Sequence, residues 1–137
     1  MTGKRYFTQW AAQFFIAAEL TRRGYLIALT LGNAPRTDII VTSPSGHSFR
    51  VECKGMRSKG AWLFKAKKGI KLWFVFCYIP KSGYPDYYIL SNEEASEKLE
   101  DYKRHHPNQA SLDKWPGCNW KDIANEDYKE KWDKLPP

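Results

Sequence analysis

Two alternating stretches, residues 37–43 and 48–56, constrain the fold of this chain more than any other feature. Polar and apolar residues alternate along both, which is typical of strands that bury one face. A Pro-Ser-Gly segment joins them and suits a type I turn with Gly46 as its left-handed residue. Such a turn pairs residues whose numbers sum to about 90, so we expect a β-hairpin in which Ile39 faces Val51.

The same register brings polar residues together on one face of the hairpin. Asp38 lies opposite Glu52, and Lys54 follows two residues later, so these side chains project from the same side. Cys53 points to the opposite, apolar face, where a small buried side chain is expected. The hairpin therefore predicts one apolar face and one face that gathers two carboxylates and an amine.

Two carboxylates and a lysine on one face have a specific chemical use. Asp38 and Glu52 could hold a hard divalent cation such as Mg²⁺, leaving positions for water and a phosphate oxygen. Lys54 would orient the attacking water or offset charge on the phosphorus. The alternative is a solvated cross-strand ion pair. The acid-x-Lys string also begins at Asp101 and Asp127, but only the string at Glu52 lies in a predicted strand with an acid opposite.

The remaining segments predict a mixed sheet flanked by helices, in the α/β (α+β) class. Apolar spacings of three and four predict a helix over residues 8–23 that ends before Gly24. Ser91 and Glu94 match a capping box and begin a second helix that runs to about Lys103. Further strands are predicted at 25–31 (buried, ending at residues 32–35), 61–67, 72–79 (central) and 87–90.

We expect one domain over residues 1–137, because a chain of 137 residues is long enough for a single core. The core would span about residues 8–106. The tail, residues 107–137, is polar but holds Trp115, Trp120 and Trp132. We expect these side chains to act as packing anchors and not as a platform for base stacking.

From the first helix to the hairpin, the order of motifs resembles the PD-(D/E)XK nuclease superfamily, which includes restriction enzymes and archaeal Holliday junction resolvases. The matching motifs are a helix that ends in Arg-Arg-Gly-Tyr, a strand, Asp-Ile-Ile-Val from Asp38, a short hairpin, and Phe-Arg-Val-Glu-Cys-Lys up to Lys54. The resemblance covers roughly residues 8–80. It implies a restriction-endonuclease-like αβββαβ core in which Asp38 and Glu52 bind Mg²⁺, or Mn²⁺ in its place, and together with Lys54 activate water to cut DNA.

The sequence departs from the family pattern at two positions. Pro35 is separated from Asp38 by two residues instead of preceding it directly. Gln13 stands where many relatives carry a glutamate on the first helix, and a neutral amide binds a metal less strongly. We include Gln13 in the candidate catalytic set, and we expect an acid restored there to strengthen metal binding.

Positive charge is concentrated in residues 53–85, which contain eight basic residues and no acidic one, while the whole chain has a net charge of +7. A field of this sign attracts polyanions, and nucleic acid is the first partner to consider. The candidate nucleic-acid-binding residues are Arg57, Lys59, Lys65, Lys67, Lys68 and Lys71. Trp62 and Phe64 lie among them and could stack on bases. Equally, the two aromatic side chains could be core and the lysines a solvated rim.

Together these features predict an Mg²⁺-dependent endonuclease that hydrolyses phosphodiesters in DNA, in recombination, repair or defence. Two alternatives stay open: a non-catalytic nucleic-acid-binding module on the same fold, and a nuclease directed at RNA, because charge does not separate DNA from RNA. Three widely spaced cysteines without a C-x-x-C pair favour the reducing cytoplasm. No segment approaches the roughly 20 apolar residues of a membrane span, so we expect no membrane partner. A domain this small that cuts both strands would act as a homodimer.

Overall fold

The computed structural model describes residues 2–31 and 37–137. Residues 32–36, which include Pro35 and the predicted end of the first strand, lie outside the described residues. In chain order the elements are α1 (Thr2–Arg22), β1 (Leu26–Leu29), β2 (Ile39–Thr42), β3 (Ser48–Met56), β4 (Trp62–Leu63), β5 (Trp73–Tyr78), β6 (Asp86–Ser91), α2 (Asn92–Arg104), α3 (Gln109–Lys114), β7 (Gly117–Cys118), α4 (Trp120–Ile123) and the 3₁₀ helix η1 (Trp132–Lys134).

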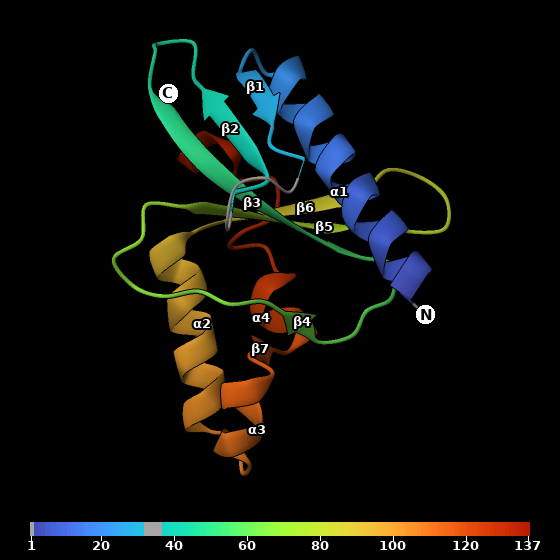
Figure 1. Cartoon of the computed structure of the whole chain (residues 1–137), viewed down its shortest axis with the longest axis vertical. Helices are drawn as coiled ribbons and strands as arrows, with labels where there is room; N and C mark the ends of the chain where they lie inside the picture. Colours follow the sequence, from blue (N-terminus) through green and yellow to red (C-terminus); the bar gives the residue numbers. More distant parts are fainter. Residues whose placement is uncertain (1, 32–36) are drawn as a thin grey trace.

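Five of the strands form one mixed sheet in the order β1-β2-β3-β5-β6 (Figure 1). β3 and β5 run parallel at its centre, and the other neighbouring pairs are antiparallel. α1 covers one face of this sheet, and α2 and α4 lie on the other side (Figure 1). The predicted α+β class, with a mixed sheet flanked by helices, is confirmed.

The β2–β3 hairpin has the predicted register, with Ile39 opposite Val51 and Val41 opposite Phe49. The Gly46 N–H donates to the Ser43 carbonyl over 2.9 Å, and Gly46 has a φ of +93°. This left-handed residue lets the turn close without misaligning the strands. Alternation along the strands then sends odd-numbered residues toward α1 and even-numbered residues toward the opposite side.

β1 corrects the prediction of a buried strand over residues 25–31. It is the edge strand of the sheet, and Leu26 is 74% exposed. Ile27 and Leu29 pack against the core under α1, while the alternate residues face away. An apolar run does not distinguish a strand buried on both faces from an edge strand buried on one face, because composition alone does not report whether a second layer covers the strand.

The connection from β3 to β5 also differs from the expected αβββαβ core. That core would carry a helix between its two parallel strands, whereas residues 57–72 contain only the short strand β4. The predicted strand over 61–67 is reduced to Trp62–Leu63, and it pairs with β7 in a separate two-stranded sheet. Trp62 and Phe64 hold this crossover in place, because both are buried in the core on that side of the sheet.

α1 begins at Thr2, six residues before the predicted start, and it ends as predicted at a left-handed glycine, Gly24, with φ +92°. Ala12, Ile16 and Leu20 recur at a spacing of four and are fully buried against the sheet. The contact is close at Gly55 of β3, where a Cβ would lie 2.7 Å from the Ala12 Cβ. No helix in the described part of the chain is long and apolar enough to cross a membrane.

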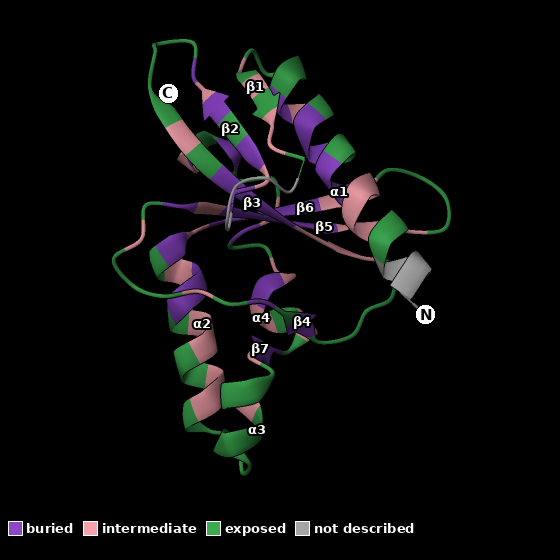
Figure 2. Ribbon diagram, viewed as in Figure 1, coloured by how far each residue is buried: buried purple, intermediate pink, exposed green. Residues whose placement is uncertain are grey.

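The side of the sheet away from α1 carries a second core, built mainly of aromatic residues and covered by α2 and α4. Buried residues of α2 and α4 are coloured purple in Figure 2. The Ser91 and Glu94 capping box that begins α2 is present as predicted. From the tail, Trp120 stacks on Trp62 with ring centroids 5.2 Å apart, and Trp132 contacts Tyr87 at 5.2 Å in the core under α1. Both of these tail tryptophans therefore pack, as predicted.

Candidate active site

Asp38, Glu52 and Lys54 line one pocket of 720 Å³ on the side of the hairpin away from α1. The hairpin register brings them together, because Asp38 directly precedes β2 and the other two are alternate residues of β3. Cys53, between them, is fully buried under α1. The predicted division of the hairpin into an apolar face and a face with two carboxylates and an amine is confirmed.

Glu52 and Lys54 form an ion pair, with 3.2 Å between the Lys54 Nζ and a Glu52 carboxylate oxygen. Glu52 is only 8% exposed. In the parallel register its neighbour on β5 is Phe74, and the neighbour of Lys54 is Phe76. Within this pair Glu52 has little contact with solvent, whereas the Lys54 side chain is 31% exposed.

Asp38 is held by hydrogen bonds on its backbone and on its side chain. The Cys53 N–H donates to Asp38 Oδ2 over 2.7 Å, and the Asp38 N–H donates to the Val51 carbonyl over 3.0 Å. Burial raises the pKa of the Asp38 carboxyl, against the opposing effects of the Cys53 N–H and the positive charge of Lys54. A second positive charge in the pocket would therefore favour the carboxylate form.

Two glutamines of α1 reach the hairpin in different ways. The buried Gln13 donates from Nε2 to the Asp38 backbone carbonyl over 3.1 Å, and it does not line the pocket. Gln9, one turn earlier, lines the pocket and donates to the Cys53 carbonyl over 2.8 Å. Gln13 therefore fixes the backbone of Asp38, whereas Gln9 is the α1 residue that faces the carboxylates. Gln9 was not among the predicted site residues. It lies four residues before Gln13, and residues at this spacing share one face of a helix.

The residues of the pocket that could hold a hard divalent cation of the Mg²⁺ type are Asp38 and Glu52. Asp38 and Glu52 supply carboxylate oxygens, and the pocket has room for the waters and phosphate oxygens that complete such a coordination shell. Over residues 2–31 and 37–137, no group of three or more His, Cys, Asp or Glu side chains is arranged to hold a metal ion. A cation here would therefore rely on two carboxylates and on oxygens from water and substrate.

The wall of the pocket outside the hairpin and α1 comes from two distant segments. Leu63, Phe64 and Lys65 come from β4 and the residues after it, and Lys114, Trp115 and Pro116 come from the segment between α3 and β7. The β4–β7 ladder joins them, and the Phe64 N–H donates to the Pro116 carbonyl over 3.2 Å. No local pattern in the sequence predicts the pairing of β4 with β7. For this reason Lys114 and Trp115 were not predicted to line the pocket.

Trp115 corrects the prediction that the tail tryptophans are packing anchors. It is 61% exposed and lies in the pocket wall. The Lys114 Nζ lies over the indole ring, 5.9 Å from its centroid. An indole in this position presents an aromatic surface to whatever occupies the pocket.

The predicted nucleic-acid-binding residues are spread over the surface, and Lys65 is the one that lines the pocket. Lys68 pairs with Glu100 of α2 at 3.4 Å, and the Lys59 Nζ lies 5.6 Å from the centre of the Tyr78 ring. Arg57 and Lys67 are exposed, and Lys71 lines a different cavity. Trp62 and Phe64 are buried, so the idea that these two rings stack on bases is wrong and the core alternative is correct for them.

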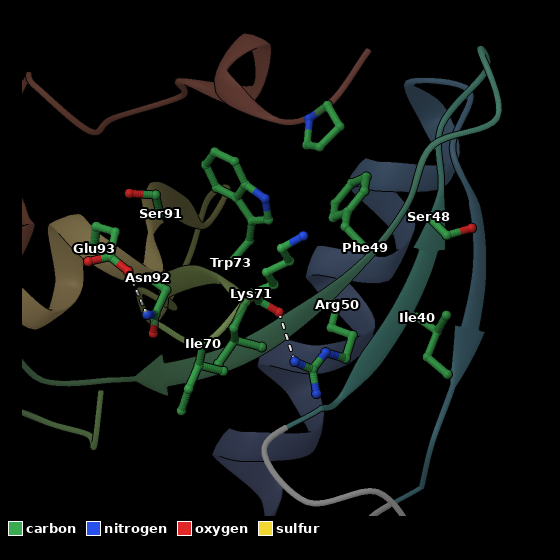
Figure 3. Close-up of a pocket in the computed structure, with 12 residues that line it drawn as sticks. Ile40, Ser48, Phe49, Arg50, Ile70, Lys71, Trp73, Ser91, Asn92 and Glu93 are labelled. Atoms are coloured by element: carbon green, nitrogen blue, oxygen red, sulfur yellow. Dashed lines mark hydrogen bonds between the residues drawn. The ribbon is translucent and has the colours of Figure 1, made fainter. Parts of the chain in front are cut away.

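The second cavity, of 540 Å³, lies where the start of β3 diverges from β5 (Figure 3). Phe49 and Trp73 contribute aromatic rings, and the Arg50 guanidinium donates to the Lys71 carbonyl over 2.9 Å. Its one carboxylate, Glu93, accepts a hydrogen bond from the Gly69 N–H over 3.1 Å. This cavity lacks the pair of carboxylates that marks the first pocket.

No protein-family model matches the chain, and neither a curated protein nor a solved structure matches it. The interpretation of the site therefore depends on its own residues and their geometry.

Proposed function

We propose that this protein is a metal-dependent nuclease of the PD-(D/E)XK kind that hydrolyses phosphodiester bonds in DNA. The observation that carries the proposal is the meeting of Asp38, Glu52 and Lys54 in one pocket of 720 Å³ with further lysines in its wall. The three unpaired, buried cysteines are consistent with the reducing cytoplasm as its compartment.

Each residue of the group has a distinct part in the proposed reaction. Asp38 and Glu52 would hold Mg²⁺, or Mn²⁺ in its place, which when bound lowers the pKa of water and polarises the phosphoryl group. Lys54 would orient the attacking water and offset the negative charge that builds on the phosphorus. Water attacks the phosphorus, and the bond from phosphorus to the leaving oxygen breaks.

The energetics of the site favour a functional interpretation over a structural one. Glu52 and Lys54 are partly desolvated, and such a pair often stabilises a fold less than well-packed apolar residues would. Asp38 is also held where burial disfavours its charged form. Groups kept in an unfavourable environment beside a pocket are candidates for chemistry.

The order of the first elements supports the family assignment in part. α1 ends at Gly24, the edge strand β1 follows, and the β2–β3 hairpin carries the acidic motif. The crossover after β3 lacks the helix of the αβββαβ core. Gln13 replaces the family's acid, and we assign it the role of positioning Asp38 through its backbone carbonyl.

The choice of nucleic acid follows from the charge of the chain. The net charge is +7, and the pocket contains Lys54, Lys65 and Lys114 against two carboxylates. Excess positive charge near a site of phosphate chemistry attracts a polyanionic substrate. The same charges are compatible with an RNA substrate or with binding that does not lead to cleavage.

The proposal is tested by cleavage of plasmid DNA and of single-stranded DNA with Mg²⁺ or Mn²⁺. We expect Asp38→Asn, Glu52→Gln and Lys54→Met each to reduce the rate by at least about 100-fold while the protein stays folded. Glu100→Gln is the control, because Glu100 pairs with Lys68 on the surface away from the pocket. Equal cleavage by the three site variants and the wild type would overturn the assignment. A wild type that binds DNA but never cuts it would favour the non-catalytic module.

A further inference from the structure

We propose that Trp115 stacks on an unpaired base of the substrate, so that the pocket takes single-stranded DNA in preference to an intact duplex. This inference rests on the proposed function, because it names the substrate that the same pocket would hold. It is carried by an exposed indole in the same pocket as the two carboxylates of the hairpin.

The exposure of Trp115 contrasts with the packing of other tryptophans of the chain. Trp62 and Trp132 are buried, and Trp120 stacks on Trp62. Trp115 is 61% exposed although it is adjacent to Pro116, whose carbonyl is bound to the crossover segment. A large apolar ring that remains in solvent while its backbone neighbour is fixed is available for a ligand.

The backbone of the wall is fixed by a close approach of β7 to β4. A Cβ at Gly117 would lie 2.4 Å from the Trp62 carbonyl oxygen, so only glycine permits this pairing. The ladder pairs Leu63 with Gly117 and Trp62 with Cys118. It fixes the segment that leads to Trp115 beside Leu63, which is itself 56% exposed in the same pocket.

An aromatic side chain of this kind selects for unpaired bases. In a duplex each base has both faces covered by its neighbours, so a protein ring cannot stack on it unless the base first leaves the helix. In a single strand the base faces are accessible, and stacking on aromatic side chains is tolerant of sequence. A pocket of 720 Å³ can accommodate a nucleotide of that strand.

The charged residues of the pocket indicate two positions for a bound nucleotide. The sugar-phosphate backbone would lie beside the hairpin, and the stacked base would lie beside Trp115. Asp38 and Glu52 lie on the hairpin side with Lys54, and the Lys114 ammonium lies over the Trp115 ring. A phosphate near Lys54 would leave the attached base to reach the indole. The stacked base would therefore belong to a nucleotide next to the bond that is cut.

The test measures binding without cleavage, in buffer containing EDTA. The probes are a fluorescein-labelled DNA strand of about 20 nucleotides, longer than the site of one small binding domain, and the same strand in a duplex. We expect Trp115→Ala to weaken binding of the single strand by about 5- to 150-fold, the value of one stacked base, and to change duplex binding by less than about twofold. Trp115→Phe should retain most of the affinity.

Tyr84→Ala provides the matched control, because Tyr84 is an aromatic residue that is 92% exposed and lies outside the pocket. Loss of affinity for both probes alike, or no loss with Trp115→Ala, would overturn the inference. So would a Trp115 effect confined to a single-stranded RNA of the same sequence. Cleavage of the duplex by wild type without any Trp115 effect would contradict only the base-stacking inference, whereas Trp115-dependent binding without cleavage would contradict only the nuclease proposal.

Discussion

The two faces of the central sheet are covered to different extents. On the α1 face the apolar residues of β2, β3, β5 and β6 form one continuous core. On the opposite face the aromatic core lies mainly against β5 and β6, with α2, α4 and the crossover packed on it. Beside it, the hairpin residues Asp38, Glu52 and Lys54 line an open pocket.

This difference explains how one strand contributes both to the core and to the candidate site. Val51 and Cys53 of β3 are fully buried under α1, whereas their neighbours Glu52 and Lys54 point to the incompletely covered side. Alternation along a strand gives the two faces independent surroundings. The candidate site lies where the second layer ends, so its polar groups keep access to water and substrate.

The largest effect on stability is expected at Gly55, on the covered face. In Gly55→Ala the new Cβ would lie 2.7 Å from the Ala12 Cβ and 2.9 Å from the Thr8 carbonyl oxygen. Because α1 backbone must move, we expect a loss of about 1–3 kcal/mol in the free energy of unfolding, measured by chemical denaturation. Gly60→Ala is the control, since a Cβ there meets nothing within 4 Å. Equal effects of the two substitutions would contradict the tight contact between α1 and β3.

For Gln13→Glu we expect a similar or smaller loss in the free energy of unfolding. This substitution tests whether Gln13 belongs to the covered face of the sheet or to the pocket. The substitution removes the amide donor to the Asp38 carbonyl and leaves a buried polar group without its partner, at a cost of about 1–3 kcal/mol. Gln9→Glu instead adds a carboxylate to the pocket and should tighten Mn²⁺ binding in calorimetry. If Gln13→Glu tightened Mn²⁺ binding more than Gln9→Glu, Gln13 and not Gln9 would be the residue that faces the cation.

On the open face, Lys65→Ala should weaken the salt dependence of nucleic-acid binding. A lysine that contacts a phosphate releases a condensed counterion, so its loss lowers the slope of log K against log salt by about 0.7 for a single strand. Fluorescence titrations at several salt concentrations would measure the slope. Lys129→Ala is the control, because Lys129 lies 3.8 Å from Asp86 and outside the pocket. A change in slope with Lys129→Ala alone would place the nucleic acid on another surface.

Among these substitutions, Asp38→Asn is expected to change the stability of the protein least. Burial raises the pKa of Asp38 above its ordinary value, so above the folded-state pKa the charged carboxylate destabilises the fold. Asparagine removes that charge and can still accept the Cys53 N–H, so the variant should melt at a higher temperature than wild type near neutral pH. The gain should disappear as the pH falls below the ordinary value of 3.8, where the carboxyl is protonated in both states. A lower melting temperature at neutral pH would indicate that the ionised Asp38 stabilises the fold.

The sequence predicted the elements that depend on local rules. The turn at Gly46 fixed the hairpin register and hence the grouping of Asp38 with Glu52 and Lys54. The same holds for the capping box of α2 and for the glycine after α1. Each of these is specified within a few neighbouring residues, so a pattern can report it.

The rest depended on contacts between distant segments. The exposure of β1 follows from its place at the sheet edge, and the short β4 follows from its pairing with β7. Trp115 could not be distinguished from the packing tryptophans, because exposure is decided by whether another segment covers the ring. Trp115 and Trp120 were both predicted to pack. Trp120 stacks on Trp62, whereas Trp115 is exposed.

Because the β4–β7 ladder joins distant segments, the two sides of the pocket can form at different stages of folding. The acidic side belongs to a single hairpin, so little chain entropy is lost in forming it, whereas the wall requires Trp62 to meet Cys118 across much of the sequence. The acidic side can thus assemble early in folding, and the wall only late. The same separation applies to substitutions or insertions near residues 114–116, which could change the wall of the pocket and leave the hairpin that carries the carboxylates untouched.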